Sequence, residues 1–401
     1  MPDIEATFDE LIRDGVLEIG DGYRAKNSEL NGRGLPFMRA GNLTKSGWNW
    51  DDLERFESGL TSNLASKVSH PGDTVITTKG NSVGRSGYVD SDAPQFVYSP
   101  HLSYWRAKQR ERLVPRFLRY WAMSPEFLNQ LRALGHGTDM APYLSLSDQR
   151  RLRVTLPKTG TQEAIGDLLG ALDDKIAVND RIAATADQYC AAVFEEVVVK
   201  ESNGITELGE VAIVNAKSVK PTPGGSLRYV DIASVSDGRL TWPERTSWDD
   251  APGRARRGIA IGDTIWSTVR PNRRSRFLVL DEDPLLVAST GFAVITPRNV
   301  GRAFLYESAR REEFVAYLES VAEGSAYPAV RAEKFLTAPI PDASDEHRDR
   351  FEELAFPVRL RAHSAAQESR VLAELRDALL PELMTGRLRV KHAEKVVEEA
   401  V

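Results

Sequence analysis

The chain repeats a domain-sized pattern, and this repeat constrains its fold more than any other feature. One heptad-patterned segment closes at 186–197, and another, which closes with LRDALLPELMTGRLRV at 375–390, follows about 186 residues later. The step Gly-Asp-Thr-aliphatic also occurs twice, at 72–75 and at 262–265. Short repeats would indicate a solenoid, whereas a period of about 185–190 residues is the size of a domain. We therefore predict two copies of one globular unit, each followed by its own long helix.

Two longer segments repeat with the same period. LPFMRAGNL from Leu35 corresponds to LRYVDIASV from Leu227. GHGTDMAPYLSLSDQRRLRVTLP, which ends at Pro157, corresponds to AEGSAYPAVRAEKFLTAPIP, which ends at Pro341. A chain of 401 residues also exceeds what one hydrophobic core usually serves. Both observations indicate two domains.

The composition predicts a soluble, cytoplasmic protein with no bound metal. No run of 18 or more apolar residues occurs, and the acidic start MPDIEATFDE lacks the apolar core of a signal peptide. The single cysteine, Cys190, excludes a disulfide framework and a cysteine-based zinc site. The six histidines are scattered without the spacing of metal ligands. We therefore expect no membrane association and no metal site.

The net charge of −6 is distributed unevenly along the chain. Residues 24–160 carry 20 Lys and Arg against 12 Asp and Glu, and residues 206–342 carry 18 of each kind. The segment 161–205, with 3 basic and 9 acidic residues, holds much of the excess acid and suits a protein partner better than a polyanion. Seven arginines between 254 and 276 favour a surface that faces phosphate or guanine. A solvated charged loop is the alternative for this cluster.

Both long segments carry the pattern of a coiled coil. In the first, apolar residues recur in alternating steps of three and four from Ile165 to Val197, which is a/d spacing, and Asn179 at an a position would fix the register. The second is less regular, and Pro357 is expected to kink or delay its first turn. Two helices that pack only on their own domains are the alternative. The residues assigned to the coil and to partner binding are Leu169, Leu172, Ile176, Asn179, Leu372, Leu375, Leu379 and Leu383.

The globular parts are predicted to be mixed α/β, because short β-rich segments such as DTVITTK and GFAVITP alternate with amphipathic helices. A loop rich in Thr, Lys, Asn and Gly follows the first Gly-Asp-Thr step at 77–86, and an arginine-rich loop follows the second at 267–274. Such donors and glycines suit contacts to base edges and phosphates. A surface hairpin is the alternative for either loop alone, but the recurrence at matching places favours nucleic acid.

Catalytic motifs are missing from the sequence. The Gly80/Gly84 loop has Arg85-Ser86 where a P-loop needs Lys before Ser or Thr, no G-x-G-x-x-G occurs, and the Asn-Pro-Pro-aromatic signature of amino-methyltransferases is not found. Asp173-Asp174-Lys175 is interpreted as a solvated charge run on the coil. We predict that the chain is not an enzyme.

Three segments resemble the specificity subunits of type I restriction-modification systems. ELRDALLPELMTGRL at 374–388 resembles that family's closing signature, and LLGALDDKIAVN at 168–179 resembles its central conserved helix. GDGYRAKNSEL at 20–30 resembles the entry to a family recognition domain. The resemblance implies two repeated target recognition domains joined by two long antiparallel coiled-coil helices, with approximate two-fold symmetry.

The domain boundaries expected from the repeat and from this resemblance cover the whole chain. They are a first target recognition domain at 1–160, a central conserved helix at 161–200, a second target recognition domain at 201–342, a C-terminal conserved helix at 343–390 and a charged tail at 391–401.

The resemblance also implies the function and the partners. In that family each half reads one half of a split DNA target, and the coil binds methyltransferase subunits, here expected to be two, which methylate adenine. Motor-nuclease subunits then join. The expected cofactors, S-adenosylmethionine, ATP and Mg, belong to those partners and not to this chain. The adapter of a related phage-defence methylation system without the nuclease stays open, as does a coiled-coil scaffold without DNA binding.

The candidate contacts to double-stranded DNA lie in both units, and their positions follow from the two loops and the segments beside them. They are Thr77, Thr78, Lys79, Asn81, Arg85, His101 and Tyr143 in the first unit, and Arg270, Asn272, Arg273, Arg274, Arg276 and Tyr327 in the second.

Overall fold

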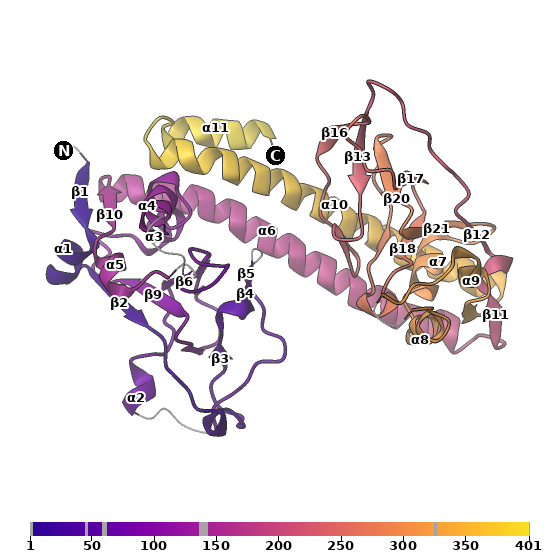
Figure 1. Ribbon diagram of the computed structural model, residues 1–401, viewed down its shortest axis with the longest axis horizontal. Coiled ribbons are helices and arrows are strands. Elements are labelled where there is room, and N and C mark those ends of the chain that lie inside the picture. Colours follow the sequence, from indigo (N-terminus) through magenta and orange to yellow (C-terminus); the bar gives the residue numbers. More distant parts are fainter. Residues whose placement is uncertain (1–2, 45–46, 58–61, 136–142, 325–326, 401) are drawn as a thin grey trace. The chain divides into compact units, whose positions relative to one another are not determined.

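The chain forms two compact units in the computed structural model, which describes residues 3–44, 47–57, 62–135, 143–324 and 327–400 (Figure 1). Residues 1–177 together with 370–401 make up unit 1, and residues 178–369 make up unit 2. Two long helices, α6 (Thr159–Phe194) and α10 (Asp345–Met384), each run from one unit into the other. Residues 136–142 of the repeated segment before Pro157 lie outside the described residues, as do 325–326 of its counterpart.

Unit 1 is built on a four-stranded antiparallel sheet, in the order β2–β9–β6–β7. Successive side chains of a strand point to opposite faces. Ile76 and Trp105 therefore join the core formed with helices α3 and α4, whereas Val75 and Tyr104 join a second core on the other face. The elements are β2 (Leu17–Asp21), β6 (Thr74–Thr77), β7 (Ser86–Tyr88), β9 (Leu102–Ala107), α3 (Pro115–Trp121), α4 (Pro125–Gly135) and α5 (Leu146–Arg150).

Unit 2 repeats this arrangement with the order β12–β21–β18–β19. Trp266 packs in one core with the helix residues Phe304 and Phe314, and Ile265, its neighbour on β18, packs in the core on the other face of the sheet. The elements are β12 (Ala212–Val214), β18 (Thr264–Ser267), β19 (Arg276–Leu278), β21 (Phe292–Pro297), α7 (Arg302–Ser308), α8 (Glu312–Ser320) and α9 (Ala332–Leu336). The repeat in the sequence is therefore a repeat of elements.

Smaller strand pairs recur in the same places. An antiparallel pair closes each globular part: β1 (Ile4–Thr7) with β10 (Arg153–Leu156), and β11 (Ile205–Glu207) with β22 (Pro339–Pro341). A parallel pair also occurs in each unit: β3 (Phe37–Met38) with β8 (Val97–Tyr98), and β13 (Ser226–Val230) with β20 (Leu286–Ser289). In unit 2, β16 (Arg245–Ser247) and β17 (Ala255–Gly258) extend this second sheet.

The repeated Gly-Asp-Thr step is a tight turn that leads into the central strand of each sheet. Gly72 and Gly262 both have a φ of +93°, which L side chains rarely adopt. The carboxylates of Asp73 and Asp263 accept hydrogen bonds from the amide three residues earlier, at 2.9 and 2.8 Å. The glycine and the aspartate of the motif therefore shape the turn, and the Asp73 carboxylate also accepts hydrogen bonds from Arg106 and Tyr98.

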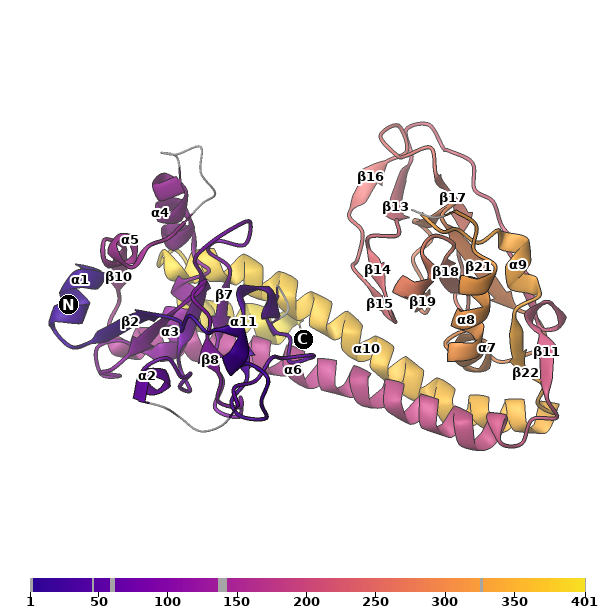
Figure 2. The same cartoon turned by 60° about the horizontal axis from the view of Figure 1, so that its bottom comes forward.

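The two long helices pack antiparallel in each unit (Figures 1 and 2). In unit 1, the core contains Leu169 and Leu172 from α6 with Leu372, Leu379 and Leu383 from α10. In unit 2, the other ends of the helices meet, because Cys190 and Phe194 share a core with Phe351 and Ala355. The predicted fold class, a mixed α/β fold of two repeated units with two long antiparallel helices, is confirmed.

Two local expectations need correction. Helix α10 begins at Asp345 and continues through Pro357, so the expected delay of its first turn does not occur. Pro357 is exposed, and water can therefore bind the carbonyl group that lacks an amide partner. The segment expected to be a charged tail forms helix α11 (Val390–Ala400), whose Ala393 is buried in the core of unit 1. None of the helices in the described ranges is long and apolar enough to cross a membrane.

Candidate nucleic-acid interface

A threonine at the end of the central strand joins three segments of unit 1. The Thr78 amide donates to the His101 carbonyl at 2.9 Å, and the Thr78 carbonyl accepts from the Leu144 amide at 2.9 Å. A β-bridge between Lys79 and Tyr143 extends the contact. The loop after β6, the turn before β9 and the segment before α5 are thereby held together.

Thr268 makes the same connections in unit 2. Its amide donates to the Gly291 carbonyl at 2.8 Å, and its carbonyl accepts from the Val330 amide at 2.8 Å. The next residue, Val269, forms a β-bridge with Ala329. Both candidate loops thus rest on one backbone frame, while the side chains that the frame displays differ between the units.

In unit 1 the frame displays four exposed side chains of mixed chemistry: Lys79, Asn81, His101 and Tyr143. Tyr143 is 61% exposed. Lysine can contact phosphate, asparagine can read adenine, and an exposed aromatic ring can pack on a sugar or base. These four candidates are therefore accessible on the surface around the frame.

The other three unit 1 candidates shape the loop instead of extending from it. Thr77 and Thr78 are buried, and the Thr77 hydroxyl is hydrogen-bonded within the loop, to the carbonyl of Ser82 and the amide of Arg85. The half-buried Arg85 donates through Nη1 to the Leu43 carbonyl at 2.7 Å. We withdraw both threonines as DNA contacts, because their side chains do not reach the surface.

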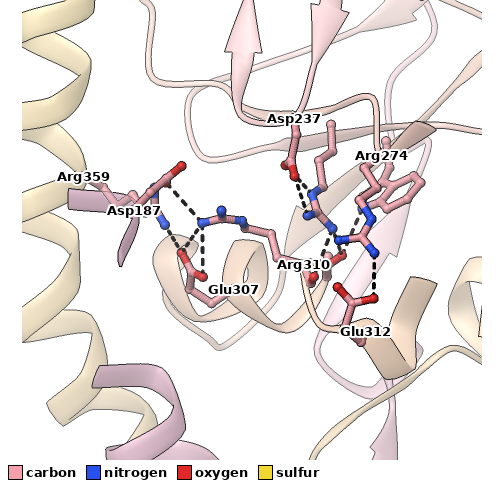
Figure 3. A network of polar contacts seen from close by, with 10 residues as sticks. Asp187, Asp237, Arg274, Glu307, Arg310, Glu312 and Arg359 are labelled. Carbon is pink, nitrogen blue, oxygen red and sulfur yellow. Dashed lines mark hydrogen bonds and ion pairs between the residues drawn. The ribbon is translucent and has the colours of Figure 1, made fainter. Parts of the chain in front are cut away.

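The unit 2 loop is fixed by two arginines in the left-handed conformation. Arg270 and Arg274, with φ of 51° and 55°, flank the short 3-10 helix η5 (Pro271–Arg273). Such φ values are uncommon outside glycine and mark a backbone held by its surroundings. Arg270 lies over the ring of Tyr327 at 4.3 Å, and Arg274 forms a 2.6 Å ion pair with Glu312 (Figure 3).

Asn272 and Arg273 form the tip of this loop. Both are exposed, and neither side chain has a hydrogen bond or an ion pair within the described parts of the chain. The 69% exposed ring of Tyr327 belongs to the segment that Thr268 holds beside the loop. Arginine suits guanine and asparagine suits adenine, so the tip carries the chemistry of a base-reading element.

Arg276 is a structural residue, and we withdraw it as a DNA contact. The residue is only 2% exposed. Its guanidinium donates to both carboxylate oxygens of Asp237, at 2.8 and 3.0 Å, and to the Arg310 carbonyl at 3.1 Å. The guanidinium also lies over the Trp266 ring at 5.6 Å. Composition could not reveal this role, because the same run of arginines contains exposed and buried members.

The arginines at 254–257 border the same frame in unit 2. The Thr290 amide, next to Gly291, donates to the Arg254 carbonyl at 2.8 Å. A β-bulge lies between Ala255 and Arg257, so Arg256 is the extra residue of the strand. Bulges redirect side chains, and this one lies in a basic segment that is hydrogen-bonded to the turn at Thr290 and Gly291, to which Thr268 also binds.

The predicted coil residues are buried in the cores. Leu169, Leu172, Leu372, Leu379 and Leu383 are at most 5% exposed, and Ile176 and Leu375 pack against the same core. The Asn179 amide group donates to Glu368 at 2.9 Å. This seam is occupied within the chain, so a protein partner would have to bind the outer faces of the helices.

Asp173 shows where the sequence interpretation failed. Its side chain is 10% exposed and accepts hydrogen bonds from Arg119, Tyr120 and Arg376, each at 2.7 Å. Only its neighbour Asp174, with a 55% exposed side chain, fits the expected solvated charge run. Asp173 lies four residues after Leu169 and three residues before Ile176, both on the seam, and this spacing was the available signal.

A related buried cluster lies in unit 2, where Asp187, Glu307, Arg310 and Arg359 form a network (Figure 3). Burial alone would raise the pKa of Asp187, but the guanidinium groups of Arg310 and Arg359 outweigh it and lower this pKa below 3.8. The described residues contain no group of three or more His, Cys, Asp and Glu that could hold a metal ion.

Comparisons with known proteins connect these features to one family. Residues 13–187 match the family model described as the type I restriction modification DNA specificity domain. The type I restriction enzyme HindI specificity subunit from Haemophilus influenzae is 24% identical over 172 residues, which are 43% of this chain and 35% of that protein. The match thus spans about a third of that relative's length.

The fold has a counterpart among solved structures. The type I restriction-modification system S subunit from M. genitalium matches 95% of this chain and 96% of its own, with a TM-score of 0.60 and 14% sequence identity. At this identity the likeness shows the fold, and it covers both units and both long helices.

Proposed function

Because this chain belongs to the DNA specificity family of type I restriction-modification systems, we propose that it is the subunit that reads a bipartite DNA target for such a system. The observation that carries the proposal is the repeated frame around Thr78 and Thr268, which displays different side chains in the two units. One frame with two sets of side chains suits two half-sites of different sequence. Backbone contacts to phosphate would position each unit, and base contacts would give the sequence preference.

The chain directs chemistry that its partners perform. It binds two methyltransferase subunits, which take a base out of the duplex and methylate adenine with S-adenosylmethionine. Motor-nuclease subunits, with ATP and Mg, complete the assembly. The outer faces of α6 and α10 are the surfaces for these partners, since the seam is already filled by Leu172 and Leu379.

DNA binding by the isolated chain is weak under this proposal. The net charge of −6 opposes a polyanion, and the excess of basic residues is local. Methyltransferase subunits that enclose the duplex supply the remaining phosphate contacts. Tight, specific binding therefore requires the complex.

Methylome sequencing tests the proposal. A host that carries this chain with its methyltransferase should gain a split methylated-adenine motif, which a host with the methyltransferase alone should lack. A related adapter that works without a nuclease would give the same methylation but no restriction of unmodified phage DNA. Absence of any new methylated motif in the complete system would refute the proposal.

A further inference from the structure

Two ion pairs between the long helices each join an acid of α6 to a base of α10. In unit 1, Asp173 Oδ1 lies 2.7 Å from Arg376 Nη1. In unit 2, Asp187 is paired with Arg359. The side chains of Asp173 and Arg359 are only 10% and 8% exposed, so these charges depend on their partners more than surface charges do.

Each of these pairs is also tied to the globular part of its unit. Arg119 and Tyr120, from α3, hold Asp173, and Glu307, from α7, holds Arg359 (Figure 3). The helices α3 and α7 occupy the same place in the two repeats. In the contact between the long and the short helix, the acid is therefore Asp173 of the long helix in unit 1, but Glu307 of the short helix in unit 2.

The sequence repeat gives this inversion an exact register. Helices α6 and α10 begin 186 residues apart, at Thr159 and Asp345. Asp173 and Arg359 differ by the same offset, as do Cys190 and Arg376. The equivalent residues Asp173 and Arg359 thus carry opposite charges. The position that Arg376 occupies in α10 is held by the neutral Cys190 in α6.

We propose that this charge pattern selects the helix partner, so that α6 pairs with α10 and not with a second copy of itself. In a pair of two α6 helices, the position of Arg359 would be taken by Asp173 of the second copy, which would face Asp187. In a pair of two α10 helices, Arg376 would face Arg359 of the second copy. Both like pairings place equal charges together in a partly buried seam, which is a repulsive element of the kind that partner specificity requires.

The exposed charges of the helices cannot make this distinction. Asp174 pairs with Arg116, but these side chains are 55% and 33% exposed. Exposed pairs contribute little, because water and salt screen them. The two partly buried pairs, Asp173–Arg376 and Asp187–Arg359, therefore carry the charge pattern of the proposal.

The selection has a consequence for DNA, which rests on the proposed function. A dimer formed through like helices would present two identical recognition units and would read a symmetric target. Pairing of α6 with α10 keeps two different units in one reader. The pairing itself can be measured without DNA, so its failure is distinct from failure of the proposed function.

Two full-length charge variants test the selection. The acidic variant carries Arg359→Asp and Arg376→Asp, and the basic variant carries Asp173→Arg and Asp187→Arg. Each variant alone has like charges in every available helix pairing, so each should unfold at a lower temperature than the wild type. When the two are unfolded and refolded together, opposite charges are available only between chains. We expect a 1:1 complex by light scattering, with a recovered melting temperature.

A matched control places the same charge change outside the seam. Arg350→Asp with Arg361→Asp alters two exposed arginines of α10 and should leave the melting temperature and the oligomeric state unchanged. If either seam variant is insoluble alone, co-expression replaces mixing, and a soluble 1:1 complex supports the proposal. The proposal is overturned if each seam variant alone has the melting temperature of the wild type. It is also overturned if the two variants, mixed or co-expressed, do not associate or remain insoluble.

Discussion

Arg273 and Arg276 are three residues apart, yet Arg273 is exposed at the tip of the loop and Arg276, the first residue of β19, is buried against Asp237. The intervening Arg274, in the left-handed conformation, turns the chain between them. The arginine-rich segment therefore contains a candidate reader and the residue that anchors the loop which carries it. Substitution of Arg273 should therefore affect DNA binding, whereas substitution of Arg276 should affect the stability of unit 2.

Arg273→Ala should weaken DNA binding by the methyltransferase complex without a change in melting temperature. If the guanidinium reads a guanine, the loss should be about 1–3 kcal/mol and confined to one half-site. If it contacts a phosphate, the loss should be uniform across sequences, with a shallower dependence on salt. Binding titrations with two half-site-substituted duplexes at several salt concentrations distinguish these cases.

Arg245→Ala is the control for that experiment. Arg245 is also exposed in unit 2, but it lies on β16, so the control removes the same charge away from the loop. Equal effects of the two substitutions, or no effect of Arg273→Ala on affinity and on salt dependence, would remove Arg273 from the interface.

Arg276→Ala should instead destabilise unit 2. Loss of the guanidinium leaves Asp237 and the Arg310 carbonyl without a donor and exposes a gap beside Trp266. Breaking a buried pair costs about 3–5 kcal/mol, and the value here should lie toward the lower end because Asp237 is 42% exposed. Thermal unfolding measures the loss. A variant that melts like the wild type but reads a changed half-site would restore Arg276 as a DNA contact.

The elements that the sequence predicted well are those set by local pattern. The heptads identified α6, because a/d spacing survives in the finished seam, and the Gly-Asp-Thr repeat located the turns at Gly72 and Gly262. The role of each charged side chain depends instead on neighbours distant in the sequence. Asp173 was taken for a solvated residue because its partner Arg376 lies 203 residues away. The frame around Thr78 escaped prediction for the same reason, since backbone hydrogen bonds leave no residue-type signature.

Exchange of residues 206–342 for the same segment of a related chain should change one half of the recognised site and leave the other intact. The structure supports these boundaries, because Thr206 pairs with Ile340 in the antiparallel ladder that closes the segment. The first junction lies in β11 and the second directly follows its partner strand β22, and both are outside the candidate loops. Methylome sequencing of the hybrid gives the result, and simultaneous loss of both half-sites would show that the units do not read independently.

Asp187→Asn should destabilise the chain at neutral pH but hardly in acid. The pKa of Asp187 is lowered from 3.8, since Arg310 and Arg359 together outweigh the effect of burial. A lowered pKa contributes stability that is present above the unfolded value and is lost as the pH falls through the folded one. We expect a difference from the wild type of about 1–3 kcal/mol at pH 7, which begins to shrink as the pH falls below 3.8 and disappears once the pH is below the lowered pKa of the folded state. Urea unfolding of both chains across this range measures it, and a difference independent of pH would contradict the assignment.

The length of the helix pair should set the spacer between the half-sites. Half-sites read from one face of B-DNA have centres about 10 base pairs apart. A heptad inserted after Asn179 alone would move either Asp173–Arg376 or Asp187–Arg359 out of register by about 10 Å, so this single insertion should destabilise the chain. A second heptad after Ala365, the equivalent position of α10, restores both ion pairs and the seam.

The paired insertion should therefore keep both half-site sequences but shift or loosen the spacer between them, because it adds about 10 Å to the helix pair. Methylation of a library with randomised spacer lengths measures the shift. Paired insertions of four residues are the control, because they break the heptad phase and should abolish methylation at every spacer length. The opposite outcome is that the complex with the paired-heptad chain methylates only sites with the original spacer. In that case, the length of α6 and α10 does not determine the distance between the half-sites.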